Sequence, residues 1–216
     1  MNIKIVYFCT FLFWSVSLSQ SVTPVRIQYG GGGDWYGNKT TWVNILEKVK
    51  NDYSLSVGGR EVSFRITDPE FRQYPIAYIA GHGNIFFTDQ EAAALRIYLT
   101  EGGFLFADDD YGMDRSFRRE MKKVFPELNF VKLPFSHPIY HLKYQFENGL
   151  PKIHEHAGGP PAGYGLLYED RLVCFYSFNT DLSDGCEDPE IHNDPPEIRA
   201  KALEMAVNIF IYALLN

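Results

Sequence analysis

The stretch Gly102–Asp110, GGFLFADDD, decides the fold. Two glycines end one element, an apolar run without polar alternation follows, and three consecutive aspartates close it. An apolar run of this kind is typical of a strand covered on both faces, as in a parallel α/β sheet. Ligands of such sheets bind outside the carboxyl ends of the strands, so the aspartates mark a candidate site.

The carboxylates of Asp108, Asp109 and Asp110 are adjacent in the chain. Like charges at the spacing of neighbouring side chains repel by roughly 1–3 kcal/mol near a protein surface. A cation, a histidinium ion or the N-terminus of a helix would offset this repulsion. We therefore expect one of these groups beside the aspartates.

Strands and helices alternate along the rest of the chain. The apolar spacing predicts further strands at Val25–Tyr29, Glu61–Ile66, Ile76–Ala80 and Arg171–Phe178, and helices at Thr41–Tyr53, Asp89–Thr100, Asp114–Phe125 and Pro195–Leu215. Thr88 and Glu91 form a predicted capping box, and Thr40 is a predicted N-cap. The alternation predicts an α/β fold with a doubly wound, mainly parallel sheet. The proline-rich segment 126–164 predicts no regular element.

Residues 1–19 have the pattern of a secretory signal peptide. A lone lysine precedes an apolar core from Ile5 to Leu18, and small residues stand before the predicted cleavage position. The core of about 14 residues is shorter than the roughly 20 that span a bilayer. We therefore expect an exported protein, periplasmic or extracellular, with one domain over residues 20–216 and no membrane span after cleavage.

The chain is acidic, with 20 basic and 27 acidic residues and a net charge of −7. Cleavage of residues 1–19 removes Lys4 and no acidic residue, which leaves 19 basic against 27 acidic residues and a net charge of −8. A surface of this sign disfavours nucleic acids and anionic membranes as partners.

A histidine ends the strand that precedes the aspartates. Consecutive strands of a doubly wound sheet are usually neighbours, so His82, in the segment Gly81 to Gly83, is expected to face Asp108 and Asp109 across one crevice. A His–Asp pair supports acid–base catalysis or, with both aspartates, binds a divalent metal through mixed ligands. The alternative stays open that His82 holds the loop while aspartates cap the next helix.

Four other histidines lie in the irregular segment and its surroundings. His137 is the one we expect in the crevice as a catalytic residue, because the proline after it makes a rigid turn that can aim a side chain. His154 and His156 flank a glutamate in a glycine- and proline-rich stretch, for which a solvated loop is the favoured interpretation over a metal site. The same interpretation is favoured for the acidic stretch between Asn179 and Asp194.

Four glycines, Gly30–Gly33, follow the first strand. They match neither the dinucleotide fingerprint nor the phosphate-loop motif. We expect them to make a tight turn that presents Asp34, Trp35 and Tyr36 to a sugar-like or peptide-like ligand, with the alternative that Trp35 covers the end of the sheet.

No activated nucleophile is evident. The sequence has no GxSxG elbow and no serine or cysteine at a strand-to-helix turn, which argues against acyl-enzyme chemistry. Cys174 lies in a predicted strand and Cys186 in a loop. An exported protein permits a disulfide between them, but two free thiols are equally compatible with the sequence.

The order of these blocks resembles a known family. GHG, GGFLFADD, KLPFSHPIY and the final NIFIYAL resemble the bacterial family described as domain of unknown function 4159, over roughly Val25 to Leu215. That family is similar to the class I glutamine amidotransferase-like and trehalose-utilisation-like folds, which implies a flavodoxin-like three-layer sandwich. The resemblance puts Gly81–Gly83 at the oxyanion position and Asp108 or Asp109 where an active amidotransferase has its cysteine, so it implies a crevice without glutaminase activity.

Three functions remain open from the sequence. The leading interpretation is a binding module that takes a small polar ligand, such as a carbohydrate or cell-envelope fragment, or a divalent metal. The second is a metal-assisted or acid–base hydrolase that uses the same aspartates and histidines. The third is a structural partner of an envelope protein. The divalent metal is the one cofactor that the residues suggest.

Overall fold

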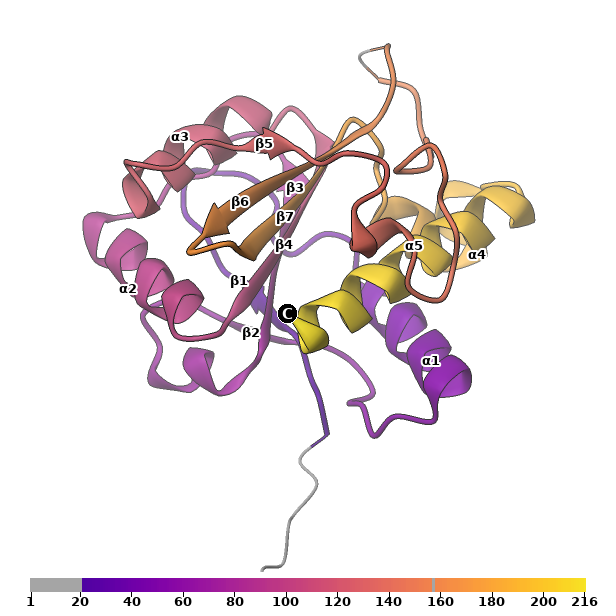
Figure 1. Cartoon of the computed structure of the whole chain (residues 1–216), viewed down its shortest axis with the longest axis horizontal. Coiled ribbons are helices and arrows are strands. Elements are labelled where there is room, and N and C mark those ends of the chain that lie inside the picture. Colours follow the sequence, from indigo (N-terminus) through magenta and orange to yellow (C-terminus); the bar gives the residue numbers. More distant parts are fainter. Residues whose placement is uncertain (1–20, 157) are drawn as a thin grey trace, which may run out of the picture.

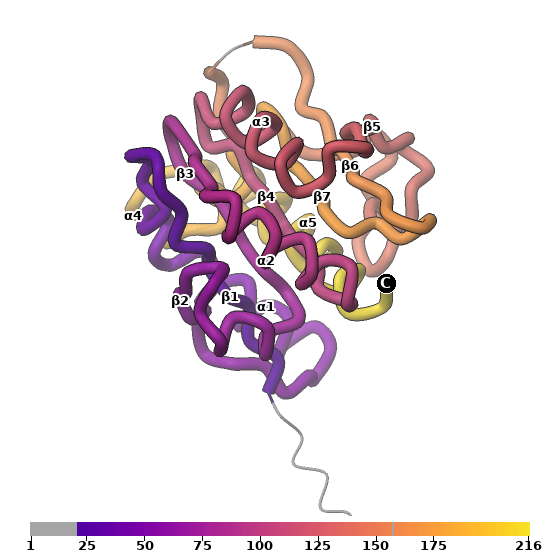
Figure 2. The backbone as a smooth tube through the Cα atoms, turned by 90° about the vertical axis from the view of Figure 1, so that its left-hand side faces the viewer, coloured from indigo at the N-terminus to yellow at the C-terminus, as the bar shows by residue number. Residues whose placement is uncertain are grey.

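The computed structural model describes residues 21–156 and 158–216, so the predicted signal peptide lies outside the described residues. Within them, seven strands form one mixed sheet in the order β2-β1-β3-β4-β7-β6-β5. Helices cover both faces of this sheet, as Figures 1 and 2 show. None of the helices in this part of the chain is both long and apolar enough to cross a membrane.

The elements follow one another in a simple order along the chain. The strands are β1 (Val25–Ile27), β2 (Val62–Phe64), β3 (Ile76–His82), β4 (Phe104–Tyr111), β5 (Val131–Lys132), β6 (Ala162–Tyr168) and β7 (Arg171–Phe178). The helices are α1 (Thr41–Tyr53), α2 (Asp89–Thr100), α3 (Asp114–Val124), α4 (Pro189–His192) and α5 (Pro196–Leu215), with short 3₁₀ turns η1 (Pro69–Gln73), η2 (Pro138–Tyr140) and η3 (Asp184–Cys186). Strands β1 to β4 and β7 are parallel, and β6 is antiparallel to both β5 and β7.

Alternation along the strands divides the core into two layers. In β3, Tyr78 faces the layer under α1 and α5, while its neighbour Ile79 faces the layer under α2 and α3. Trp42 of α1 is buried and forms T-shaped ring pairs with Tyr78 and Phe106, with ring centroids 5.4 and 6.5 Å apart. The predicted doubly wound α/β sandwich is therefore confirmed, in a mixed sheet with a flavodoxin-like arrangement.

The sequence pattern predicted no regular element over 126–164, where the structure has β5, η2 and the start of β6, and it did not predict α4. The longest of these elements is β6. Gly163 and Gly165 interrupt its strand signal, since glycine is unfavourable within strands. A Cβ at Gly163 would collide with the hydroxyl of Tyr140, and one at Gly165 would collide with Leu172. The glycines are thus required by the close packing of side chains over the β6–β7 hairpin.

The capping box at the start of α2 is present as predicted. The Thr88 hydroxyl accepts the backbone N–H of Glu91 at 3.2 Å, and the Glu91 carboxylate accepts the backbone N–H of Thr88 at 2.8 Å. Thr40 does not cap α1 in this way, because its hydroxyl accepts the N–H of Asp188 instead.

Thr88→Ala is expected to destabilise the fold by about 1 kcal/mol, because the first turn of α2 loses its side-chain acceptor. Urea unfolding checks this value. The exposed Thr67 makes no such bond, so Thr67→Ala is the control and should change stability by less than about 0.5 kcal/mol. Equal effects in the two variants would contradict the assigned cap.

Candidate functional site

Strand β4 delivers its three aspartates to opposite faces of the sheet. Because side chains alternate along a strand, Asp108 and Asp110 lie on the side of α1 and α5, and Asp109 lies on the side of α3. All three are buried, with exposed fractions of 0, 5 and 0 % from Asp108 to Asp110. The sequence placed them together at a strand end, and the structure separates them by face.

Asp108 is held by two hydroxyl-bearing residues. The Ser177 hydroxyl, on the neighbouring residue of β7, donates to one carboxylate oxygen, and the Ser183 backbone N–H donates to the other at 2.6 Å. Burial raises the pKa of Asp108 to about 7, although both hydrogen bonds act to lower it. Its carboxyl group therefore takes up a proton far more readily than an exposed aspartate.

One carboxylate oxygen of Asp110 has a hydrogen-bond partner, and the other has none. Oδ2 accepts a hydrogen bond from Asn38 Nδ2 at 3.1 Å, whereas Oδ1 is buried without a hydrogen-bond partner. The same Asn38 nitrogen donates to Asp184 Oδ1 at 2.9 Å and so joins the two carboxylates. Burial, and then the charges of Asp108 and Asp184, raise the pKa of Asp110 well above its usual range.

Arg26 of β1 fixes the loop that carries Asn38. Its guanidinium donates to the carbonyls of Trp35, Gly37 and Asn38 at 3.1, 2.8 and 2.9 Å. It also forms a buried ion pair with Glu61, with 2.8 Å between Nη2 and Oε1. This clamp holds Asn38 in a left-handed conformation, with φ of 50°, between the two carboxylates.

Asp109 stabilises the start of α3, the structural role that the sequence left open for these aspartates. It accepts the backbone N–H of Met113, just before α3, at 3.0 Å, and the Tyr176 hydroxyl donates to it at 3.3 Å. Burial raises its pKa. One of the three aspartates thus helps to fix the start of the next helix, as the alternative interpretation proposed.

His82 pairs with Asp34 instead of the aspartates of β4. Its backbone N–H donates to Asp34 Oδ1, and its Nδ1 lies 3.1 Å from Asp34 Oδ2. A Cβ at Gly81 would collide with Asp34, which shows how closely the two loops approach. Trp35 and Tyr36 pack edge to face with centroids 5.7 Å apart beside this pair. Gly83 leads into the same loop, and ligand binding by these residues stays a prediction.

His137 lies outside this region. It precedes η2, where its Nδ1 accepts the N–H of Ile139, and its ring packs 5.4 Å from that of Tyr212 on α5. Tyr212 in turn packs against Phe104, the first residue of β4, at the opposite end of that strand from the aspartates. The rigid turn therefore aims His137 at α5, and the structure does not bring it to the crevice.

The stretches for which solvated loops were expected meet at the carboxyl end of the sheet, which corrects that interpretation. Asp181, Asp184 and Glu187 are buried, with exposed fractions of 1, 7 and 6 %. The carbonyl of Thr180 accepts the N–H of Ile153, so backbone pairing carries the histidines that follow to these acidic residues. The missed signal is the H-x-H pattern of 154–156, since alternate residues of an extended segment point the same way.

His154 is oriented by three carboxylates. Its Nε2 lies 3.0 Å from Asp194 Oδ1, while Nδ1 lies 3.3 Å from Asp181 Oδ2 and 3.5 Å from Asp184 Oδ2. The neighbouring carboxylates of Asp181 and Asp184 raise the pKa of His154 to about 10. A carboxylate on the far ring nitrogen is the arrangement that orients metal-binding histidines in proteins.

The ligand atoms converge on a small volume. His156 Nε2 also contacts Asp181 Oδ2, yet this buried oxygen has no hydrogen bond of proper alignment. The ligand atoms of His154, His156 and Asp181 lie within 4.8 Å of one another, as do those of His154, Asp184 and His192. Ligand atoms about 2.0–2.1 Å from a tetrahedral zinc ion stand about 3.3 Å apart, close to the separation of His154 Nδ1 and Asp181 Oδ2.

These five residues, His154, His156, Asp181, Asp184 and His192, form a His–Asp cluster. A cavity of about 180 Å³ adjoins it. It is lined by Asp109, Tyr111, Gly112, Asp114, His156, Phe178, Asn179 and Asp181. It therefore brings together one of the predicted aspartates and two residues of the His–Asp cluster. Its lining combines three aspartates with the aromatic rings of Tyr111 and Phe178.

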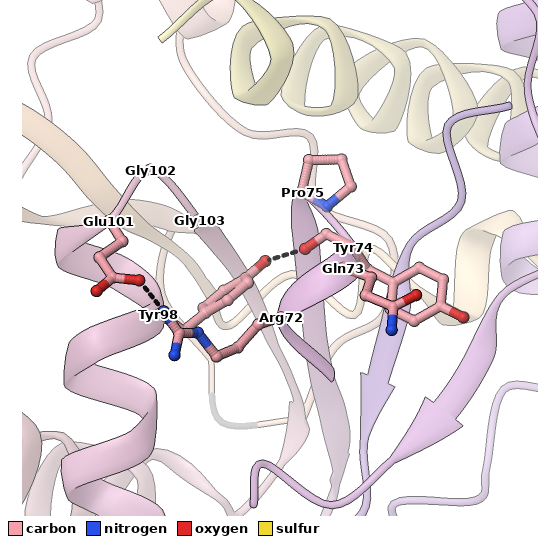
Figure 3. A pocket seen from close by; sticks show the side chains of 8 residues that line it. All are labelled: Arg72, Gln73, Tyr74, Pro75, Tyr98, Glu101, Gly102 and Gly103. Carbon is pink, nitrogen blue, oxygen red and sulfur yellow. Dashed lines mark hydrogen bonds and ion pairs between the residues drawn. The ribbon is translucent and has the colours of Figure 1, made fainter. Parts of the chain in front are cut away.

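Figure 3 shows a pocket at the other end of the sheet, where β3 and β4 begin. It measures about 530 Å³ and holds the exposed ion pair of Arg72 and Glu101, and the Tyr98 hydroxyl donates to the carbonyl of Tyr74 at 3.0 Å. None of the candidate site residues lines it.

Both cysteines of the described segments are free and buried, which settles the alternatives left open by the sequence. Burial raises the pKa of Cys174 and of Cys186 well above the usual thiol range. Neither is expected to react with a maleimide at neutral pH in the folded protein, and both should react in guanidinium. Mass mapping of labelled peptides checks this, and labelling of Cys186 in the native state would contradict it.

The family comparison agrees with the resemblance seen in the sequence. The family described as Domain of unknown function (DUF4159) matches residues 23–214, nearly the whole chain. Among curated proteins, no match was found. The link to amidotransferase-like folds stays a prediction. Because the match spans the sheet, the helices and the His–Asp cluster, the chain belongs to the DUF4159 family.

Proposed function

We propose that this chain binds a divalent transition metal ion through His154, His156 and Asp181, with Asp184 and His192 beside it. The observation that carries the proposal is the buried Asp181 Oδ2, which faces two imidazole nitrogens without an aligned hydrogen bond. In the metal-free protein a proton on His154 offsets the carboxylates. A metal ion would replace that proton and satisfy all three ligand atoms.

Zinc is the ion that this donor set favours. Two imidazoles and a carboxylate suit a borderline ion such as Zn²⁺, whereas Mg²⁺ and Ca²⁺ prefer oxygen ligands alone. This assignment moves the proposed metal away from His82 and Asp109, which are held by Asp34 and by Met113 and Tyr176 respectively.

A second candidate function is metal-assisted hydrolysis, with a polar ligand such as a carbohydrate or cell-envelope fragment as the substrate class. The adjoining cavity supports this function. Three protein ligands leave the fourth coordination position of zinc open. His156 and Asp181 belong to the His–Asp cluster and also line the cavity, so this open position is near the cavity. A zinc ion at such a position polarises a bound group as a Lewis acid. Asp109 and Asp114 would contact the substrate from the cavity wall.

Zinc titration of the chelator-treated protein tests the proposed metal binding. We expect a saturable rise in melting temperature on addition of Zn²⁺, lost in His156→Ala and kept in the control His141→Ala. His141 is a partly exposed histidine on another loop, hydrogen-bonded to Gln145 and to the carbonyl of Phe135. No rise, or the same rise in His156→Ala as in the wild type, would overturn the proposal.

A further inference from the structure

A wide cavity lies where β3 and β4 end and α3 begins. It measures about 670 Å³, within the range of roughly 300–1,000 Å³ that is usual for small-molecule sites. Among the described residues that line it, two are arginines and none is acidic: Gly83, Asn84, Gly112, Arg115, Ser116 and Arg119. This arginine-lined cavity therefore concentrates positive charge in a chain whose net charge is −7.

The acidic residues of α3 do not neutralise this charge. Asp114 pairs with Arg118 and Glu120 with Lys123, each with 2.6 Å between the nitrogen and the oxygen. These two pairs use both carboxylates of the helix. Glu120 also contacts Arg119, but its single charge is already balanced by Lys123. The two arginines of the cavity therefore leave an excess of positive charge at its wall.

Arg119 is fixed in place and still has donors to spare. Its Nε donates to Glu120 Oε1 at 2.6 Å, and its Nη2 donates to Asn84 Oδ1 at 3.2 Å and to the carbonyl of Ile85 at 2.7 Å. Within the described part of the chain, Nη1 makes no hydrogen bond, so its two N–H groups are open to a ligand. A side chain that is already ordered loses little conformational freedom when it binds.

Arg115 has no partner to hold it. It lies four residues before Arg119 in α3, so the two side chains are neighbours on one face of the helix. Arg115 forms neither a hydrogen bond nor an ion pair with the described residues, whereas Arg118 and Arg119 form both. Like charges at this spacing destabilise a helix. An anion between the two guanidinium groups would remove that repulsion.

We propose that Arg115 and Arg119 bind the phosphate group of a small ligand in the arginine-lined cavity. A phosphate monoester carries about −1.5 to −2 charges at pH 7, which matches two guanidinium groups, whereas a carboxylate carries only one. The planar fork of an arginine also donates two parallel hydrogen bonds to phosphate oxygens.

The place of this site in the fold is defined by Gly112. This glycine lines both the arginine-lined cavity and the cavity beside the His–Asp cluster, so a ligand held by its phosphate lies next to the second cavity. None of the described residues that line the arginine-lined cavity belongs to the His–Asp cluster. The phosphate site therefore goes beyond the proposed metal site and does not depend on it.

Isothermal titration calorimetry of inorganic phosphate into the chelator-treated protein, at constant ionic strength, tests this site. We expect saturable binding of one phosphate per chain, with acetate weaker by about tenfold or more. Arg115→Gln should weaken phosphate binding by about tenfold or more, and Arg115→Lys, which keeps the charge without the fork, should weaken it less. The control Arg60→Gln, at an exposed arginine just before β2, should bind phosphate within about twofold of the wild type.

The outcomes are distinct from those of the zinc experiment. Absence of saturable phosphate binding would overturn the site. The same affinity in Arg115→Gln as in the wild type would mean an adventitious ion only, and acetate binding as tight as that of phosphate would contradict the charge match. Arg115 is exposed, so Arg115→Gln should fold normally and keep the full zinc response. Loss of phosphate binding with that response intact would therefore locate the effect in the arginine-lined cavity.

Discussion

Asp181→Asn is expected to abolish the stabilisation that zinc gives to this protein. The substitution keeps the shape of the side chain but removes the charge of the oxygen that His154 and His156 face. At a zinc concentration one hundred times the dissociation constant, the wild type should gain about 2.7 kcal/mol, and the variant close to none. Thermal unfolding of the chelator-treated protein, with and without added Zn²⁺, measures the difference.

The matched control for this experiment is Asp188→Asn. Asp188 lies in the same acidic stretch, where it accepts a hydrogen bond from Asn44 outside the His–Asp cluster. We expect this variant to keep the full zinc response. If Asp181→Asn responded to zinc as strongly as Asp188→Asn, the acidic stretch would be a structural ion-pair network, and the proposed metal site would be wrong.

Arg26→Leu is expected to destabilise the protein by about 3–5 kcal/mol, the range for breaking a buried ion pair by removing one partner. It leaves Glu61 buried without its guanidinium, and it removes three hydrogen bonds from the loop that carries Asn38. Guanidinium unfolding measures the loss. The double variant Arg26→Leu/Glu61→Leu should recover part of it, because no uncompensated carboxylate remains.

The ion pair of Arg72 and Glu101 provides the comparison, because both of its side chains are exposed (Figure 3). Arg72→Leu should cost less than about 1 kcal/mol, as exposed ion pairs generally do. A loss in Arg26→Leu no larger than that in Arg72→Leu would mean that the clamp does not hold the loop.

The fold could be predicted because its main elements depend on local patterns. The helix Thr41–Tyr53 and the strand Arg171–Phe178 have the bounds expected from apolar spacing alone. Strand β6 could not be predicted, because its glycines weaken the strand pattern and are explained only by tertiary packing. Gly163 makes room for Tyr140, which is remote in the chain, and Gly165 makes room for Leu172 on the partner strand β7. Local pattern fails where tertiary packing selects the residue.

The candidate site was predictable in location and not in composition. The aspartates of β4 do lie at the carboxyl end of the sheet, yet alternation sends Asp109 to the face opposite Asp108. His154 and His156 are carried to Asp181 by backbone hydrogen bonds with Thr180, a pairing that no local pattern encodes. Their loop therefore looked solvated in the sequence although its histidines contact buried acids.

Anomalous diffraction at the zinc absorption edge, from crystals of the zinc-loaded protein, tests the central claim most directly. The account predicts a peak within about 2.0–2.2 Å of His154 Nδ1, His156 Nε2 and a carboxylate oxygen of Asp181. The absence of a peak there, or a peak at His82 and Asp34 with those three side chains unchanged, would contradict it.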